Sequence, residues 1–160
     1  MAAAIRATDT ILIAAAPREV WRVLTDFGRY QAWWPGNVPV RALQTPPELV
    51  GAELEIRPRG GPPFRCRLER LVAEEELVFR YCAGPYQGTG TWRLAWTGGG
   101  TAVSYTADLT SDQWLLRFFS RLTDLGRAHS RLMRPVLAGL RRTVSGRPKR
   151  RGGWPSEELI

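Results

Sequence analysis

Apolar residues recur at three- and four-residue steps through residues 110–144, near the C-terminus of the chain. This spacing places them on one face of an amphipathic helix. The residues of this apolar stripe are Leu115, Phe118, Leu122, Leu125, His129, Leu132, Val136 and Leu140. Thr110 and Gln113 fit a capping box at the start of the helix, and Pro135 predicts a kink within it. We predict one helix over 110–144, about 50 Å long, around which the preceding chain folds.

The first forty residues change from a strand pattern to a helical pattern. Residues 4–14 are rich in β-branched residues and predict a first strand. Pro17 stands where a helix begins, and apolar residues then keep a helical step as far as Phe27. A second short helix over 29–33 ends at Pro35. The pattern therefore predicts one strand followed by two short helices.

Alternating apolar and polar residues predict six further strands between residues 38 and 109. In the first hairpin that can be registered, a tight turn at Glu74–Glu75 places Leu68 opposite Tyr81 on the inner face. The same register turns Arg70 inward. An inward arginine would bind a ligand carboxylate, whereas an arginine at the sheet rim would belong to an ion pair.

The second hairpin turns at residues 98–100. This turn pairs Trp92 with Tyr105, Leu94 with Val103, and Trp96 with Thr101. The two hairpins together place four aromatic side chains on the inner face of the sheet, namely Tyr81, Trp92, Trp96 and Tyr105. A strand, two short helices, six antiparallel strands and a long helix make an α+β fold.

The net charge of the chain is +8, and Lys149 is its only lysine, so the excess is almost all arginine. Most arginines stand singly among apolar residues, but six basic residues cluster between positions 141 and 151. Residues 145–160 are polar, rich in Gly and Pro, and without a period, which predicts a disordered basic tail after a domain over 1–144. Such a tail would suit an RNA or anionic-lipid partner.

The remaining composition narrows the class of protein. No apolar run reaches the roughly 20 residues that cross a bilayer, and the start of the chain lacks a secretion pattern, so we expect a cytoplasmic protein without membrane insertion. Because most arginines are dispersed along the chain, we expect no specific nucleic-acid partner. Cys66 and Cys82 fall on opposite faces of their hairpin, so no disulfide is expected. With His129 as the only histidine, we expect no metal and no cofactor.

Two segments carry a family resemblance. Residues 11–35 hold Ala16-Pro17, Val20-Trp21 and Asp26-Phe27, followed by Tyr30, Trp33 and Pro35, and residues 88–109 hold a late hairpin with Gly-Thr before the last strand. In this order, the chain over 5–144 resembles the START/Bet v 1-like (SRPBCC) superfamily and, within it, the polyketide cyclase/dehydrase-type proteins. The resemblance implies a helix-grip fold, a curved seven-stranded antiparallel sheet wrapping a long C-terminal helix, with a cavity for apolar molecules between them. It implies no catalytic residue, because the family has no universal catalytic motif.

The candidate ligand-binding residues are Trp33, Trp34, Phe79, Tyr81, Trp92, Trp96, Tyr105, Leu125, His129 and Met133. Of the adjacent Trp33 and Trp34, one is expected in the core and the other as a gate at the cavity mouth or a surface residue, because neighbours in a helix point in different directions. The alternative is that both only support the fold. His129 would suit proton transfer or a hydrogen bond to a ligand, or it is a core histidine with a protein partner. Arg70 and Asp108 are the charged strand residues whose placement the pattern leaves open.

Three functions follow from these patterns. The leading hypothesis is the binding of a small hydrophobic molecule, of aromatic, polyketide or lipid type, in the cavity. The second is an enzyme of the polyketide cyclase/dehydratase type, with His129, Tyr81 or Tyr105 moving protons in the same cavity. The third is an interaction protein whose basic tail binds RNA or anionic lipid, and salt would weaken that binding steeply.

Overall fold

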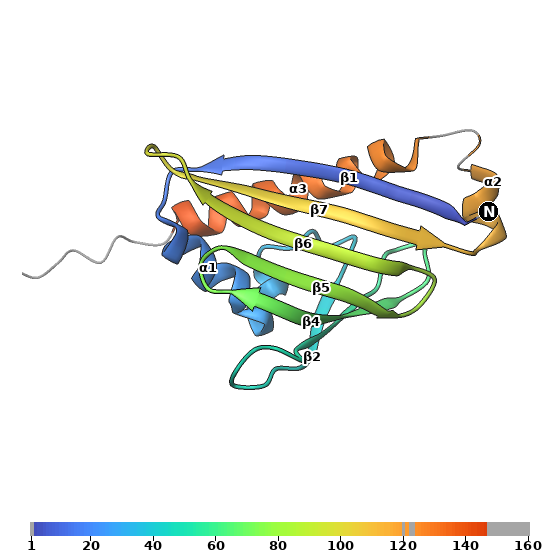
Figure 1. Cartoon of the computed structure of the whole chain (residues 1–160), viewed down its shortest axis with the longest axis horizontal. Coiled ribbons are helices and arrows are strands. Elements are labelled where there is room, and N and C mark those ends of the chain that lie inside the picture. Colours follow the sequence, from blue (N-terminus) through green and yellow to red (C-terminus); the bar gives the residue numbers. More distant parts are fainter. Residues whose placement is uncertain (1, 120, 122–123, 147–160) are drawn as a thin grey trace, which may run out of the picture.

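A computed structural model of the protein describes residues 2–119, 121 and 124–146. Seven antiparallel strands in the order β1-β7-β6-β5-β4-β3-β2 form one curved sheet along the helix α3 (Figure 1). The strands are β1 Ala3–Ile13, β2 Val40–Gln44, β3 Glu53–Ile56, β4 Phe64–Val72, β5 Glu76–Ala83, β6 Gln87–Trp96 and β7 Thr101–Ser111. The helices are α1 Pro17–Thr25, the 3-10 helix η1 Phe27–Ala32, α2 Trp114–Phe119 and α3 Leu125–Ser145. The predicted α+β helix-grip fold is confirmed.

The C-terminal helical stretch consists of two helices, so the prediction of one helix over 110–144 is wrong. Thr110 belongs to β7, where it is paired with Ala4 of β1 and Gln87 of β6, so it cannot cap a helix. The carboxylate of Asp124 caps α3 instead, accepting hydrogen bonds from the backbone N–H of Gly126 at 2.9 Å and of Arg127 at 3.2 Å. Pairing with two strands therefore overrides the helical period at 110–111.

The hairpin of β6 and β7 has the predicted register. Trp92 is paired with Tyr105, Leu94 with Val103, and Trp96 with Thr101. Trp96 thus has the same inner-face parity as Trp92 and Leu94, but its side chain is 58% exposed rather than buried. β5 begins with Glu76 opposite Arg93, so Trp96 extends past the end of the neighbouring strand and is left uncovered.

The hairpin of β4 and β5 differs by two residues from the predicted register. Leu68 is paired with Phe79 rather than with Tyr81. A three-residue turn contributes one residue of the shift, and a β-bulge between Leu68 and Arg70 contributes the other. The bulge also turns Arg70 outward, where it forms a 2.6 Å ion pair with Glu76, so Arg70 is not an inward ligand-binding residue.

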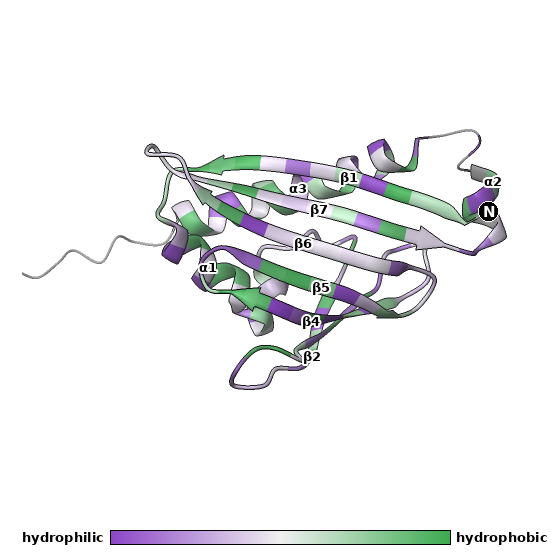
Figure 2. Ribbon diagram, in the orientation of Figure 1, coloured by the Kyte–Doolittle hydropathy of each residue, from purple (hydrophilic) through white to green (hydrophobic). Residues whose placement is uncertain are grey.

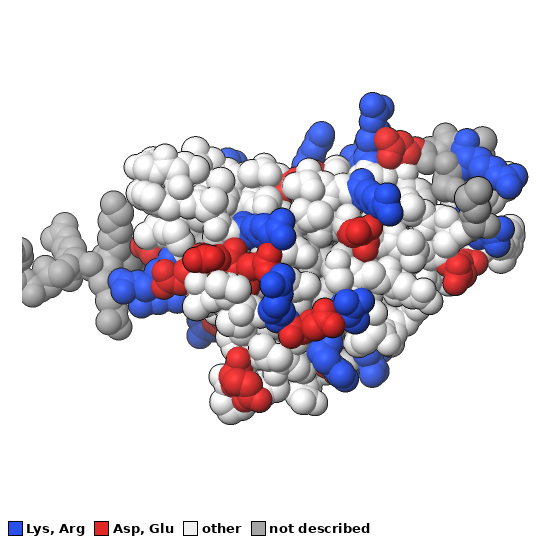
Figure 3. Space-filling model, in the orientation of Figure 1, with Lys and Arg blue, Asp and Glu red and all other residues white. Residues whose placement is uncertain are grey.

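The outer face of the sheet carries charges of both signs side by side (Figure 3). Most of them form ion pairs between neighbouring strands, such as Arg80 with Glu69 at 2.9 Å and Arg93 with Glu76 at 2.8 Å. Asp108 belongs to this set through a 3.2 Å pair with Arg6. Of the cysteines, both unpaired, Cys82 is exposed and Cys66 is buried, as the strand parity predicted.

The core lies between the inner face of the sheet and the helices, and Figure 2 shows hydrophobic residues recurring along the strands that enclose it. At one end α1 packs against α3. Leu24 of α1, Leu140 of α3 and Val103 of β7 are fully buried there. Gly139 lets the helix approach closely, since a Cβ at this position would lie 2.1 Å from the carbonyl oxygen of Trp33.

No helix of the described residues is long and apolar enough to cross a membrane. The predicted domain boundary falls beside the end of α3 at Ser145. The predicted basic tail, apart from its first two residues, lies outside the described part of the chain.

Candidate functional site

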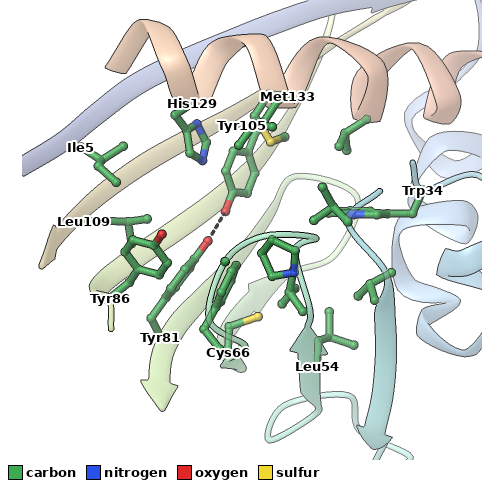
Figure 4. A pocket seen from close by; sticks show the side chains of 18 of the residues that line it. Ile5, Trp34, Leu54, Cys66, Tyr81, Tyr86, Tyr105, Leu109, His129 and Met133 are labelled. Atoms are coloured by element: carbon green, nitrogen blue, oxygen red, sulfur yellow. Dashed lines mark hydrogen bonds between the residues drawn. The ribbon is translucent and has the colours of Figure 1, made fainter. Parts of the chain in front are cut away.

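A cavity of about 400 Å³ lies between the sheet and the N-terminal half of α3 (Figure 4). Its walls come from the inner face of the strands, from residues of α3, and from the loops before β2 and between β3 and β4. The expected space between helix and sheet is therefore present rather than filled by side chains.

Eight of the ten candidate residues line this cavity, namely Trp34, Phe79, Tyr81, Trp92, Tyr105, Leu125, His129 and Met133. Trp33 and Trp96 do not. Trp33 is a core residue whose ring packs against Tyr30 at 4.8 Å between centroids, whereas Trp34 reaches the cavity. Trp96 lies beyond the end of β5, as described above. The position of the eight residues in the cavity wall does not test whether they bind a ligand, so that role stays a prediction.

The sequence patterns missed several wall residues. Tyr86 and Phe64 complete an aromatic cluster with Tyr81, in which Phe64 stacks on Tyr81 at 5.3 Å and meets Tyr86 edge-on at 5.2 Å. The loop over 58–62 and Asn37 line one end of the cavity. The sequence feature that could have indicated this loop is its position directly after the buried Ile56 of β3. A loop, however, has no period that shows which way its side chains point.

Two tyrosine hydroxyls meet in the cavity. The hydroxyls of Tyr81 and Tyr105 lie 3.1 Å apart and form a hydrogen bond, drawn as the dashed line in Figure 4. Tyr105 fits because residue 90 is glycine, since a Cβ there would lie 2.0 Å from its hydroxyl oxygen. Burial raises the pKa of both tyrosines above the ordinary value, so both are neutral phenols at neutral pH.

His129 extends this polar cluster from α3. Its ring stacks on that of Tyr105, with 6.0 Å between centroids and 12° between planes. Burial lowers the pKa of His129, and the carboxylate of Asp9 offsets part of that shift, so the imidazole is predominantly neutral at neutral pH. The hydroxyl of Ser130 donates to Asp9 at 3.0 Å. Nδ1 of His129 is buried and has no hydrogen-bond partner.

Among the described residues, two buried polar atoms of the wall have no hydrogen-bond partner, Nδ1 of His129 and Nε1 of Trp34. Buried polar atoms in native proteins normally have a partner, so each such exception calls for a specific explanation. The Trp33 indole nitrogen is a third such atom, but Trp33 lies outside the cavity wall. The thiol of Cys66 also lines the cavity, and burial raises its pKa well above the ordinary value, which keeps it protonated and lowers its reactivity.

The arrangement can enclose an apolar molecule and offer it a few fixed polar contacts. The phenols can donate or accept hydrogen bonds, and a neutral imidazole can accept a proton. Over residues 2–119, 121 and 124–146, no group of three or more His, Cys, Asp or Glu residues is placed to hold a metal ion.

Comparison with known proteins places this geometry in context. Residues 4–145 match the family model described as "Polyketide cyclase / dehydrase and lipid transport". A search of curated protein sequences gave no significant match.

Several solved structures share the fold. A START superfamily protein from Mycobacterium smegmatis superposes with a TM-score of 0.67 at 12% identity, over 88% of this chain and 97% of that one. The di-domain ARO/CYC StfQ of the steffimycin biosynthetic pathway gives 0.67 at 16% identity, over 90% of this chain and 52% of the longer one. Norcoclaurine synthase from Thalictrum flavum, in complex with dopamine and hydroxybenzaldehyde, gives 0.65 at 12% identity, over 91% and 89%. At such low identities the likeness establishes the fold alone.

Proposed function

The chain belongs to the polyketide cyclase / dehydrase and lipid transport family, within the START/SRPBCC superfamily, and on this basis we propose that it binds a small, largely apolar molecule in the cavity between the sheet and α3. The observation that carries the proposal is the cavity itself, about 400 Å³ in volume, with two unsatisfied polar atoms in its wall. A bound molecule would supply the hydrogen-bond partners that the protein lacks there.

The size and chemistry of the wall support this function. Pockets for small ligands have volumes of roughly 300–1,000 Å³ and are mostly apolar with a few placed polar groups. Here most of the wall is aliphatic or aromatic, and one cluster of polar atoms is formed by Tyr81, Tyr105 and His129. A ligand with an apolar body and one or two oxygen or nitrogen atoms fits both features.

A cavity-filling variant tests the proposal. Ala128 lines the cavity from α3, so in Ala128→Trp an indole would occupy the ligand space. We expect at least about a tenfold loss of affinity for the neutral fluorophore N-phenyl-1-naphthylamine, because overfilling removes the space that a ligand needs. Arg131→Trp is the matched control, since Arg131 is exposed on the same helix and is not part of the wall. Equal affinities of the two variants would contradict binding in the cavity.

The natural ligand can be identified from the purified protein. Denaturing protein isolated from its own host and analysing the released compounds by mass spectrometry would reveal a molecule bound in stoichiometric amount. An apolar compound of a size that fits the cavity is the expected result, and its structure defines the substrate class for the next test.

A second function, catalysis of the polyketide cyclase/dehydratase type, has one specific observation in its favour. The neutral imidazole of His129 stacks on a phenol that is hydrogen-bonded to a second phenol. Such a group can remove a proton while a phenol donates a hydrogen bond to a carbonyl oxygen. With the released compound as substrate, His129→Ala should lower the rate constant of turnover more than the affinity. An unchanged rate would exclude His129 from a mechanism.

A further inference from the structure

The loop between β3 and β4 holds a single cationic side chain at the cavity. Arg59 lines the cavity together with the neighbouring Pro58, Gly60, Gly61 and Pro62. The side chain of Arg59 is exposed, so it stands where the cavity meets solvent. This end of the cavity is its mouth.

The backbone of this loop is held in place. The N–H of Arg59 donates to the carbonyl oxygen of Asn37 at 3.0 Å, and the N–H of Gly61 donates to that of Pro58 at 3.3 Å. The prolines at 58 and 62 restrict the backbone further, because their rings fix φ. The guanidinium of Arg59 is therefore carried on an ordered part of the mouth.

Arg59 differs from the other arginines at this end of the sheet. Arg41, Arg57 and Arg65 all form ion pairs with Glu55, at 3.3, 2.7 and 3.4 Å. Arg59 takes part in no ion pair within the described residues, and the cavity wall they form contains no Asp or Glu. Glu55 thus pairs with three guanidinium groups that lie outside the cavity wall, whereas the guanidinium of Arg59 is in the wall and has no acidic partner among the described residues.

We propose that the ligand carries an anionic group, such as a carboxylate, and that Arg59 binds this group at the mouth of the cavity. The inference rests on the proposed function and names the chemical class of its ligand. The apolar body of the ligand would lie against the aromatic wall, and the guanidinium would donate two hydrogen bonds to the anionic group. The attraction is stronger here than at an open surface, because the apolar wall on one side lowers the effective dielectric constant.

Two fluorescent probes with the same apolar body test the proposal. 8-Anilinonaphthalene-1-sulfonate is anionic, and N-phenyl-1-naphthylamine is the same skeleton without the sulfonate. The measured quantity is the ratio of their affinities for the full chain, since each protein then corrects for its own apolar binding. We expect Arg59→Gln to lower the ratio of anionic to neutral affinity by about 5- to 10-fold.

Matched variants separate the site from the total charge. Arg18→Gln removes one positive charge from an exposed position of α1 outside the cavity wall and should leave the ratio unchanged. Arg59→Lys keeps the positive charge but lacks the planar guanidinium, so it should retain part of the preference for the anionic probe. Added salt should weaken the anionic probe alone.

The outcomes distinguish this inference from the function on which it rests. Equal ratios in Arg59→Gln and Arg18→Gln would overturn the role of Arg59 even if both probes bind. Unchanged binding of both probes to Ala128→Trp would instead contradict the cavity as the binding site. Loss of preference in Arg59→Gln with neutral binding intact would support both.

Discussion

The two halves of α3 carry similar apolar residues but face different surroundings. The C-terminal half packs Leu137, Leu140 and Val144 into a filled core against α1. The N-terminal half presents Leu125, His129 and Met133 to an open cavity. Periodicity in the sequence is the same in both halves, so the difference comes from the elements opposite the helix.

The elements opposite α3 explain why the space beside one half of the helix is filled and the space beside the other half is a cavity. α1 and η1 lie beneath one half of α3 and supply buried side chains such as Leu24 and Phe27. The other half lies over a wall made mainly of the concave sheet and the loops at its end, to which the short elements η1 and α2 add only Tyr30 and Leu116. Stability should therefore depend mainly on the filled half, and ligand affinity on the hollow half.

The largest expected contrast comes from two leucines of the same helix. Leu140 is fully buried in the filled half, so Leu140→Ala should lower the free energy of unfolding by about 2–5 kcal/mol. Leu132 is 52% exposed beside the cavity, so Leu132→Ala should cost about 1 kcal/mol or less. Urea unfolding followed by tryptophan fluorescence measures both values. Equal losses would remove the distinction between the two halves.

Two glycines test the same difference between the halves, because a Cβ at either position would collide with a neighbouring group. Gly139→Ala drives a Cβ against the backbone carbonyl of Trp33, which cannot move aside, and should destabilise the protein by about 1–3 kcal/mol. Gly90→Ala drives a Cβ against the hydroxyl of Tyr105, whose ring can turn into the cavity.

Gly90→Ala should therefore change binding more than stability. Displacement of Tyr105 breaks its hydrogen bond to Tyr81, so the cost in unfolding free energy should be about 1 kcal/mol. The affinity for N-phenyl-1-naphthylamine should fall, whereas Gly139→Ala should leave it close to that of the wild type in the folded state. The reverse result would mean that Tyr105 is held as rigidly as the backbone at Trp33.

The last expected effect is the pH dependence of stability. Burial lowers the pKa of His129 in the folded state, so below about pH 6.5 the unfolded chain binds more protons at this residue than the folded one. The free energy of unfolding should therefore decrease as pH falls from about 7 to about 5.5, with a slope of at most about 1.4 kcal/mol per pH unit from this group. His129→Phe should flatten the curve in this window.

Comparing the wild type with His129→Phe isolates the contribution of His129 to the pH dependence, because exposed carboxylates titrate in both proteins. Asp9, which faces the imidazole, acts against the shift, so Asp9→Asn should steepen the dependence. Identical slopes for wild type and His129→Phe would show that the imidazole is not desolvated in the folded state.

Much of the fold could be predicted from local patterns. The register of β6 and β7 followed from strand parity and a glycine turn, because neither strand contains a bulge. The register of β4 and β5 did not, since a bulge inserts one residue without changing the kinds of residue around it. At Thr110 a helical period coincided with a strand that two neighbours stabilise, and the tertiary pairing prevailed.

The candidate site was partly predictable for the same reason. Strand parity placed Tyr81 and Tyr105, and the helical apolar stripe placed His129, toward the space between sheet and helix. It could not show that this space is hollow there and filled beside Leu140, because that depends on how far α1 and η1 reach. It also missed Arg59, whose direction is set by loop hydrogen bonds rather than by a period.

The two free thiols should react with a thiol reagent at different rates. Cys82 is exposed and Cys66 is in the cavity wall, so a thiol reagent meets one at the surface and the other only after entering the space that a ligand would fill. The labelling rate of Cys82 then sets the reference for an unhindered thiol. The delay at Cys66 reflects both its raised pKa and the fraction of time for which the cavity admits the reagent. A bound molecule would lower the labelling rate of Cys66 in proportion to its occupancy, so this rate would report the loading of the protein without an added dye.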